Sequence, residues 1–224
     1  MSSYSKTILV DFIRHGEPHG GDILRGRIDP ELTDLGWLQM RMAANLNRDF
    51  LPSELTPNWT KIITSPLRRC RDFSERLATG INLQTNVNNN WQEIDYGDWD
   101  GMLISDWRKA AAEQFKAFRE DLSALAPPNG EDYLSFKDRI LGAYRQLVEK
   151  SDDGTHILVI THGGVLRVIL PSILGMPLNK SFPLNIPFAC FSRIKIVEVA
   201  GALSASLIFH NGAEYSSLSN QRAT

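Results

Sequence analysis

Two apolar stretches of this chain end in the same way, with a polar residue, a histidine and a glycine. Residues 8–13 lead to His15, and residues 157–161 lead to His162 and Gly163. Such short, β-branched runs are typical of buried strands. Ligands of open α/β sheets gather at the carboxyl ends of the strands, and glycine there lets backbone amides approach them. The sequence therefore predicts that both imidazoles face one crevice, although either motif alone is equally typical of a histidine hydrogen-bonded to carbonyl groups.

Segments typical of strands and helices alternate along most of the 224 residues. Strands are expected at 7–13, 59–64, 156–161, 189–199 and 203–210, a loop or edge strand at 82–90, and helices at 33–50, from 65 onward, at 103–120, 131–150 and 165–174. Thr33 and Ser65 are the expected N-caps of the first two helices. The alternation predicts one α/β domain over 1–224, a three-layer α/β/α sandwich with a mostly parallel central sheet and an antiparallel addition near the C-terminus. The helical stretch of about 100–150 is expected to form a lid-like insertion.

Three arginines stand in the first turns of the helix expected after Ser65. Arg68, Arg69 and Arg71 oppose the helix dipole there, by about 0.3–1 kcal/mol each if they are exposed. A bound anion would reverse that sign, and the guanidinium fork matches phosphate oxygens. The alternative is a solvated helix face whose arginines pair with nearby carboxylates. Because Arg68 and Arg69 point about 100° apart, they cannot serve one site equally.

Four carboxylates are mixed with aromatic residues between positions 91 and 101. They are Glu93, Asp95, Asp98 and Asp100. Apolar surroundings can keep a carboxylic acid protonated near neutral pH, as a general acid requires. Each of the four could instead be an ordinary charge of a solvated loop.

Charge and cysteine content exclude several classes of protein. A formal net charge of −2 gives no reason to expect nucleic acid or an anionic membrane as a partner, so an anionic substrate must be captured by local positive charge. The two cysteines, Cys70 and Cys190, are far apart and are interpreted as reduced thiols outside any metal-ligand spacing. No signal segment or long apolar run is present, which predicts a cytoplasmic protein. Whether the chain forms a homo-oligomer is left open.

Together these features resemble the histidine phosphatase superfamily, also called the phosphoglycerate mutase-like family. Five elements carry the resemblance, in order between about residues 8 and 170: Arg14-His15-Gly16-Glu17, Leu32-Thr33-Asp34-Leu35-Gly36, Ser65-Pro66-Leu67-Arg68-Arg69-Cys70, Glu93 followed by Tyr96-Gly97, and Thr161-His162-Gly163-Gly164. An Arg-His-Gly triplet alone is weak evidence, whereas five elements in order are strong.

The resemblance implies a phosphoglycerate mutase-like fold and a role for each matching residue. His15 is the nucleophile that becomes phosphohistidine, Glu93 donates a proton to the leaving group, and Arg14, Arg69 and His162 form the phosphate pocket. Because these groups supply the positive charge that phosphoryl transfer requires, no metal or other cofactor is expected. Gly163 is expected to contact the substrate, and Glu17 to have a supporting role.

Three activities remain open within the resemblance. Glu93 and His162 are only 69 positions apart, and the mutase asparagine after the nucleophile is absent, so hydrolysis of a small phosphorylated metabolite is favoured over a mutase reaction. A third possibility is a regulatory module that binds phosphate compounds without turnover.

The loop after His15 suggests a substrate. The residues from 14 to 18 and from 24 to 29 are similar to the α-ribazole phosphatases of cobalamin synthesis, which would place Arg25 and Arg27 near the mouth of the site. Both arginines could equally be surface charges. Phosphatases of sugar phosphates and broad-specificity enzymes share similar loops, and Cys70 and Glu131-Asp132 depart from the usual pattern, so the subfamily stays open.

Overall fold

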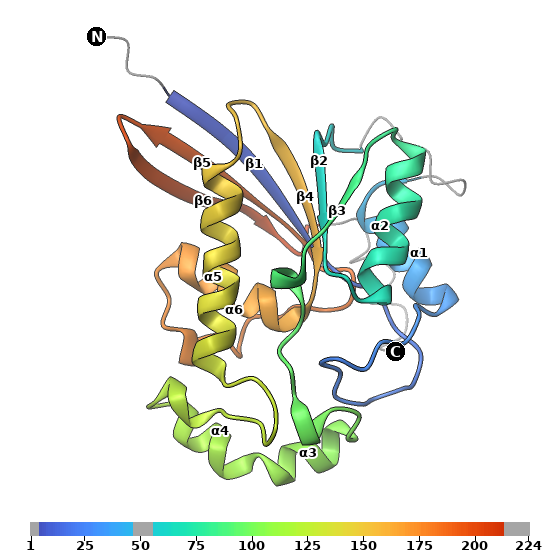
Figure 1. Ribbon diagram of the computed structural model, residues 1–224, viewed down its shortest axis with the longest axis vertical. Coiled ribbons are helices and arrows are strands. Elements are labelled where there is room, and N and C mark those ends of the chain that lie inside the picture. The colour runs from blue at the N-terminus through green and yellow to red at the C-terminus, as the bar shows by residue number, and fades with distance from the viewer. Residues whose placement is uncertain (1–4, 47–55, 213–224) are drawn as a thin grey trace.

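A six-stranded sheet forms the centre of the computed structural model, which describes residues 5–46 and 56–212 (Figure 1). The strands are β1 (Ser5–Arg14), β2 (Lys61–Thr64), β3 (Thr85–Val87), β4 (His156–Thr161), β5 (Phe191–Val199) and β6 (Ala202–His210). Their order is β3-β2-β4-β1-β5-β6, with parallel pairing from β3 to β1 and antiparallel pairing of β5 with β1 and of β6 with β5. The predicted mostly parallel sheet with an antiparallel addition is confirmed.

Helices cover both faces of this sheet. They are α1 (Asp34–Ala43), α2 (Arg68–Gly80), α3 (Ile104–Ala110), α4 (Ala112–Phe118), α5 (Tyr133–Glu149) and α6 (Gly163–Leu174), with short 3-10 helices η1 (Asn89–Trp91), η2 (Gly97–Trp99), η3 (Leu122–Ala124) and η4 (Leu178–Lys180). Successive side chains of a strand point to opposite faces. In β4, Ile157 and Val159 join the core beneath α5 and α6, whereas Leu158 and Ile160 join the core beneath α1 and α2. The three-layer arrangement is thereby confirmed.

The register of β1 and β4 places the two histidine motifs side by side. Arg14 lies opposite Thr161 at the last position of the parallel pair, so both strands end at the same level. His15 and His162 are the next residues, and they leave the sheet at the same edge.

The helical stretch of 100–150 divides into two parts. Helices α3 and α4 lie beyond the carboxyl ends of the parallel strands, away from the sheet layers (Figure 1). Helix α5 instead packs on the sheet face, where Phe136, Ile140 and Leu147 are buried in the core. The lid-like part is therefore confined to about residues 104–124, a segment that we call the cap.

Two helix boundaries differ from the predicted ones. Thr33 caps α1 as expected, accepting a hydrogen bond from the Gly36 amide at 2.9 Å, but α1 ends at Ala43, and Asn45 adopts a left-handed φ of 54°. The expected end near residue 50 lies outside the described residues. The prediction of Ser65 as an N-cap is wrong, because α2 begins at Arg68 and its N-cap is Leu67, two residues after Ser65. Of the helices in the described ranges, none has the length and apolar character that a membrane span needs.

Candidate active site

His15 follows β1 and is held in one tautomer. Its Nδ1 lies 2.8 Å from the carbonyl oxygen of Gly16. Because a carbonyl oxygen only accepts, Nδ1 must carry the proton, which leaves the lone pair of a neutral ring on Nε2. Burial, reinforced by the charges of Arg69 and Arg14, holds the pKa of His15 well below its usual value. The ring is therefore neutral at neutral pH and has a nucleophilic nitrogen.

His162 stands against His15 at the start of α6. The two ring centroids are 5.3 Å apart in an edge-on arrangement. Nε2 of His162 lies 2.7 Å from the Ser65 hydroxyl, and burial keeps the pKa of His162 well below its usual value. The Ser65 hydroxyl thus contacts the second histidine, and it also accepts a hydrogen bond from the Leu67 amide at 3.3 Å.

Arg14 is a half-buried cation whose Nε atom is buried. Its Nη1 donates to the carbonyl of Ile186 at 2.6 Å, and its guanidinium lies 4.3 Å from the ring centroid of Phe188. Its Nε has no hydrogen-bond partner among the described residues. A Cβ at Gly163 would lie 3.3 Å from this Nε, so the glycine leaves room beside it. An unpaired buried donor costs about 1–3 kcal/mol, and a bound anion would remove that cost.

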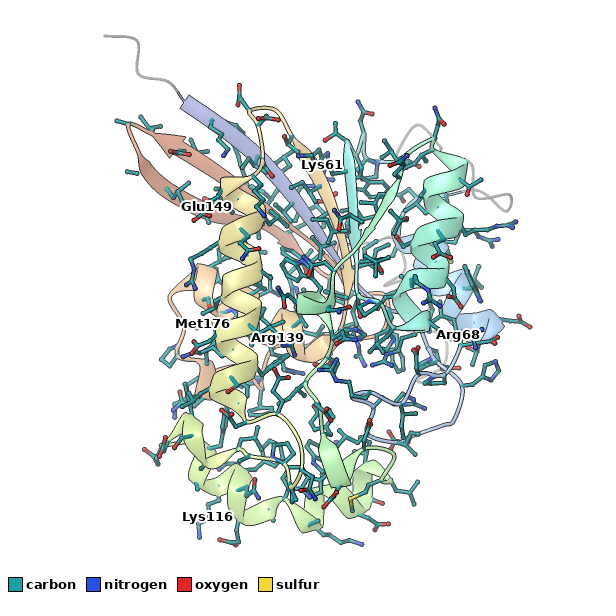
Figure 2. The ribbon with its side chains drawn as sticks, in the orientation of Figure 1. Lys61, Arg68, Lys116, Arg139, Glu149 and Met176 are labelled. Carbon is teal, nitrogen blue, oxygen red and sulfur yellow. The ribbon has the colours of Figure 1, made fainter. Side chains whose placement is uncertain are left out.

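Arg69 separates from its two neighbours on α2. Its side chain is fully buried and donates to the carbonyls of Gly26 at 2.9 Å and Ile28 at 2.7 Å, while its Nε is also unpaired within the described ranges. Arg68 and Arg71 instead form exposed ion pairs with carboxylates. The solvated-face interpretation therefore holds for Arg68 and Arg71 only, and Arg68 lies at the outer edge of the molecule (Figure 2).

Glu93 is the one predicted acid that reaches the site. Its carboxylate accepts hydrogen bonds from the amides of Gly164 at 2.9 Å and Ile94 at 3.0 Å. A Cβ at position 164 would lie 2.1 Å from Oε1, so only glycine allows this approach. Burial raises the pKa of Glu93, although the two N–H groups partly oppose the shift. The carboxyl group is thereby suited to hold a proton.

The other three candidate carboxylates have structural partners. Asp100 accepts a hydrogen bond from the amide of Arg27 at 2.7 Å, and Asp98 accepts one from the side chain of Asn129 at 2.9 Å. Asp95 lies 3.6 Å from the Arg27 guanidinium. These aspartates therefore hold loops in place.

A cavity of about 1370 Å³ opens at the carboxyl end of the sheet, between the strands and the cap. The predicted site residues that line it are Arg14, His15, Arg25, Glu93 and Gly163. Arg69 and His162 contribute no surface to the cavity and are fully buried next to His15. The structure thus presents His15, Arg14 and Glu93 to a ligand, with Arg69 and His162 beneath them.

The two loop arginines differ in their position. Arg25 lines the cavity, but its Nη atoms donate to the carbonyls of His19, Gly21 and Ile23, so they organise the loop. Arg27 does not line the cavity, because it pairs with Gln92 and Asp95. The position of Arg27 near the mouth of the site therefore stays a prediction, since its guanidinium lies beside Gln92 and acts on His162 without lining the cavity. Glu17 lines the cavity, and its supporting role stays a prediction.

Sequence reasoning missed two residues that contact the site. Phe188 packs against both Arg14 and His15, with ring centroids of Phe188 and His15 5.8 Å apart. It lies in a segment without strand or helix periodicity, so no local signal marks it. Ser65 was visible but was interpreted as a helix cap.

Comparison with known proteins identifies the family. The model of the histidine phosphatase superfamily (branch 1) matches residues 10–205. Among curated relatives, phosphoserine phosphatase 1 of Hydrogenobacter thermophilus is 28% identical over 94% of this chain and 96% of its own length. Glucosyl-3-phosphoglycerate phosphatase of Mycolicibacterium vanbaalenii is 28% identical over 75% of each chain, and adenosylcobalamin/α-ribazole phosphatase of Salmonella typhimurium is 24% identical over 83% of this chain and 89% of its own.

Solved structures share the fold. A mycobacterial glucosyl-3-phosphoglycerate phosphatase superposes with a TM-score of 0.74 at 21% identity, covering 94% of this chain and 100% of the other. The α-ribazole phosphatase of Shigella flexneri gives a TM-score of 0.73 at 23% identity, covering 91% and 96%. The sheet order and the match over residues 10–205 together show that this chain belongs to the histidine phosphatase superfamily, branch 1.

Proposed function

We propose that this phosphatase hydrolyses a small phosphorylated metabolite through a phosphohistidine on His15, without a metal ion. The observation that carries the proposal is the tautomer of His15, whose protonated Nδ1 is bound to the Gly16 carbonyl and whose Nε2 is left for attack. A carboxyl group with a raised pKa, Glu93, lines the same cavity.

In the first step, Nε2 of His15 forms a bond to phosphorus as the ester P–O bond breaks. The departing alkoxide takes the proton of Glu93, and the alcohol leaves. In the second step, the Glu93 carboxylate removes a proton from water, whose oxygen attacks phosphorus and frees His15. Inorganic phosphate is the product, and Glu93 regains its proton.

Positive charge in the pocket stabilises the phosphoryl group during both steps. Arg14 reaches the cavity directly, and its unpaired Nε is a donor for a phosphoryl oxygen. Arg69 and His162 complete the pocket in this proposal. Both side chains are fully buried.

For the substrate, α-ribazole 5′-phosphate is the first compound to test. Relatives at 24–26% identity carry the name of adenosylcobalamin/α-ribazole phosphatase, and the cavity is large enough for a ring system beside the phosphate. If this assignment is right, its kcat/KM exceeds that of phosphoserine and of simple sugar phosphates. A flat profile across the panel would contradict it.

Phosphate release in excess chelator tests the chemistry. Native protein is compared with His15→Ala and with His19→Ala, a second histidine of the same cavity that serves as the matched control. Chelator-resistant hydrolysis that disappears only in His15→Ala supports the proposal. Full activity of His15→Ala would end it.

Transfer of phosphate between two positions of the substrate would favour a mutase, and binding without turnover would favour a regulatory module. Cytoplasmic location and the absence of nucleic acid and membrane partners stay predictions, and the oligomeric state stays open.

A further inference from the structure

The cavity extends well beyond the residues that would handle a phosphate group. Its far part lies between the cap, the start of α5 and the 178–182 segment. We call this part the outer chamber and define it by Trp107, Phe115, Arg119, Tyr133, Lys180 and Phe182, all of which line the cavity. None of these residues belongs to the proposed chemistry.

Aromatic rings form a continuous row along the outer chamber. The row starts at Tyr96, whose ring centroid is 6.1 Å from that of Trp107. Trp107 lies 5.0 Å from Phe115, and Phe115 lies 5.5 Å from Phe182. Since Tyr96 interacts electrostatically with Glu93, the row runs from the proposed acid outward. Successive rings meet edge-on, at interplanar angles of 68°, 89° and 78°, so the row offers the alcohol portion of an ester one aromatic face at a time.

Two members of the chamber hold polar groups that the described residues do not satisfy. The Tyr133 hydroxyl and the Trp107 Nε1 are buried and have no hydrogen-bond partner in the described part of the chain. Tyr133 is only 7% exposed, and burial raises its pKa to about 12, so the hydroxyl remains a donor. A row of rings that served packing alone would need no such donors, because phenylalanine would fill the same space.

The cap turns its positive charges toward the cavity. Between residues 104 and 124 it carries four cations, Arg108, Lys109, Lys116 and Arg119, and four anions, Asp106, Glu113, Glu120 and Asp121. Two of these cations line the cavity, and none of these anions does. The carboxylates that line the cavity, Glu17, Asp22 and Glu93, come from other segments, so the cap itself contributes only positive charge to its lining.

Arg119 and Lys180 form the cationic end of the chamber. The side chain of Asn179 donates to the Arg119 carbonyl at 2.5 Å, which joins η4 to the end of α4. In the described part of the chain, neither cationic side chain has a hydrogen-bond or ion-pair partner. Both are therefore available to an anionic group of a ligand.

We propose that the outer chamber binds the alcohol portion of the substrate, which carries a flat ring system and, at its far end, a second acidic group. The ring stacks on Trp107, and the carboxylate or phosphate group faces Arg119 and Lys180. This inference rests on the proposed phosphatase function and narrows its substrate class. α-Ribazole 5′-phosphate has the ring but not the second acid, so this inference predicts that a ring-bearing ester with a second acid exceeds it in kcat/KM.

Matched synthetic esters test the second acid separately from the chemistry. The series is 2-phenylethyl phosphate bearing a carboxylate or an isosteric carboxamide on the ring, attached directly or through a two-carbon arm. The reacting alcohol is the same in every member, so differences in kcat/KM report the far end. We expect the better carboxylate to exceed its carboxamide by about tenfold, which corresponds to one charge-assisted contact.

The variant Arg119→Gln/Lys180→Gln should bring this ratio close to one while changing hydrolysis of unsubstituted 2-phenylethyl phosphate less than about twofold. Lys116→Gln is the matched control, because Lys116 lies on the outer side of α4, does not line the cavity and should leave the ratio unchanged (Figure 2). A ratio near one in the native protein, or an unchanged ratio in the double variant, would overturn the proposal.

The ring requires its own variant. Trp107→Leu should reduce the preference for 2-phenylethyl phosphate over ethyl phosphate by about fivefold, because it removes stacking area but keeps an apolar side chain. An unchanged preference would reject the stacking surface.

Failure of the phosphatase proposal can be told apart from failure of this inference. If the native protein hydrolyses no ester, calorimetric binding of the carboxylate and carboxamide esters to native protein still measures their affinity ratio. A tenfold ratio that the double variant loses would support the outer chamber as an anion site, and equal affinities would reject it.

Discussion

Strand β1 leads through two buried polar clusters that differ in how completely their donors and acceptors are paired. In the first, Asp11 is fully buried and accepts hydrogen bonds from Trp59 at 2.8 Å, His156 at 2.8 Å and Arg193 at 2.7 and 2.9 Å. In the second, around His15, two arginine Nε donors have no partner in the described part of the chain. The first cluster is complete without a ligand, and the second is not.

The contrast separates structural from functional burial of charge. A buried ion that the protein pairs fully contributes to the fold and has nothing left to offer a substrate. Arg14 and Arg69 retain unpaired donors beside a neutral nucleophile, which is the arrangement expected where an anion binds. Variants that remove one cation from each cluster should therefore affect different measurements.

The largest effect is expected for Arg69→Met. It removes a cation from the phosphate pocket, so kcat/KM should fall by about a hundredfold to a thousandfold. Inorganic phosphate should also no longer raise the Tm, as it should for the native protein. Arg71→Met, on the exposed side of the same helix, is the control and should keep both properties. Near-native activity of Arg69→Met would remove Arg69 from the phosphate pocket.

The next largest effect is expected for Arg193→Met. It leaves Asp11 buried without its bidentate partner, so the free energy of unfolding should fall by about 3 kcal/mol in a urea titration, with activity per folded molecule retained. Arg68→Met breaks only exposed ion pairs and should change stability little. A loss of activity per folded molecule in Arg193→Met would show that the two clusters are coupled.

The smallest effect is a difference in pH dependence. Burial acts to raise the pKa of Asp11, but the hydrogen bonds from Arg193 and His156 outweigh it, so the net shift is downward. Its stabilising contribution is present above the unfolded-state pKa and is lost as pH falls through the lower native pKa. For Glu93 the pKa is raised, and the sign reverses.

Acid unfolding measures this difference directly. The unfolding free energy of the native protein should fall more steeply below about pH 4 than that of Asp11→Asn, because the variant lacks the titrating carboxyl group. Glu93→Gln should instead remove a contribution that declines as pH rises. Identical slopes for native protein and Asp11→Asn would show that Asp11 does not control acid stability.

The parts of this structure that follow local patterns were predictable. The strands were predictable because their apolar residues either alternate or form an uninterrupted run. The meeting of His15 and His162 was predictable because each comes directly after a strand of the parallel pair. The separation of Arg69 from Arg68 was also expected from helical geometry. The spacing of Phe136 and Ile140 predicted an apolar face on α5, but it did not predict which surface of the sheet this face covers.

Contacts between distant segments were not predictable from one sequence. Asp11 and Arg193 are brought together by the antiparallel pairing of β1 with β5, in which they lie directly opposite each other. Ser65 has the sequence context of a helix cap, and only the approach of His162 gives it another partner. The outer chamber likewise depends on the packing of Phe182 against the cap.

The contact between Glu93 and the Gly164 amide requires that residue 164 has no Cβ atom, so the proposed activity depends on glycine at this position. Both donors to the carboxylate are backbone amides, so no side-chain replacement elsewhere can substitute for them or remove them. A change of Gly164 to alanine would place a carbon 2.1 Å from the carboxylate oxygen and would force the acid out of its position. Under the proposed function, one of the smallest changes that a gene can make would thus remove turnover while the phosphate pocket of Arg14 and Arg69 stays in place.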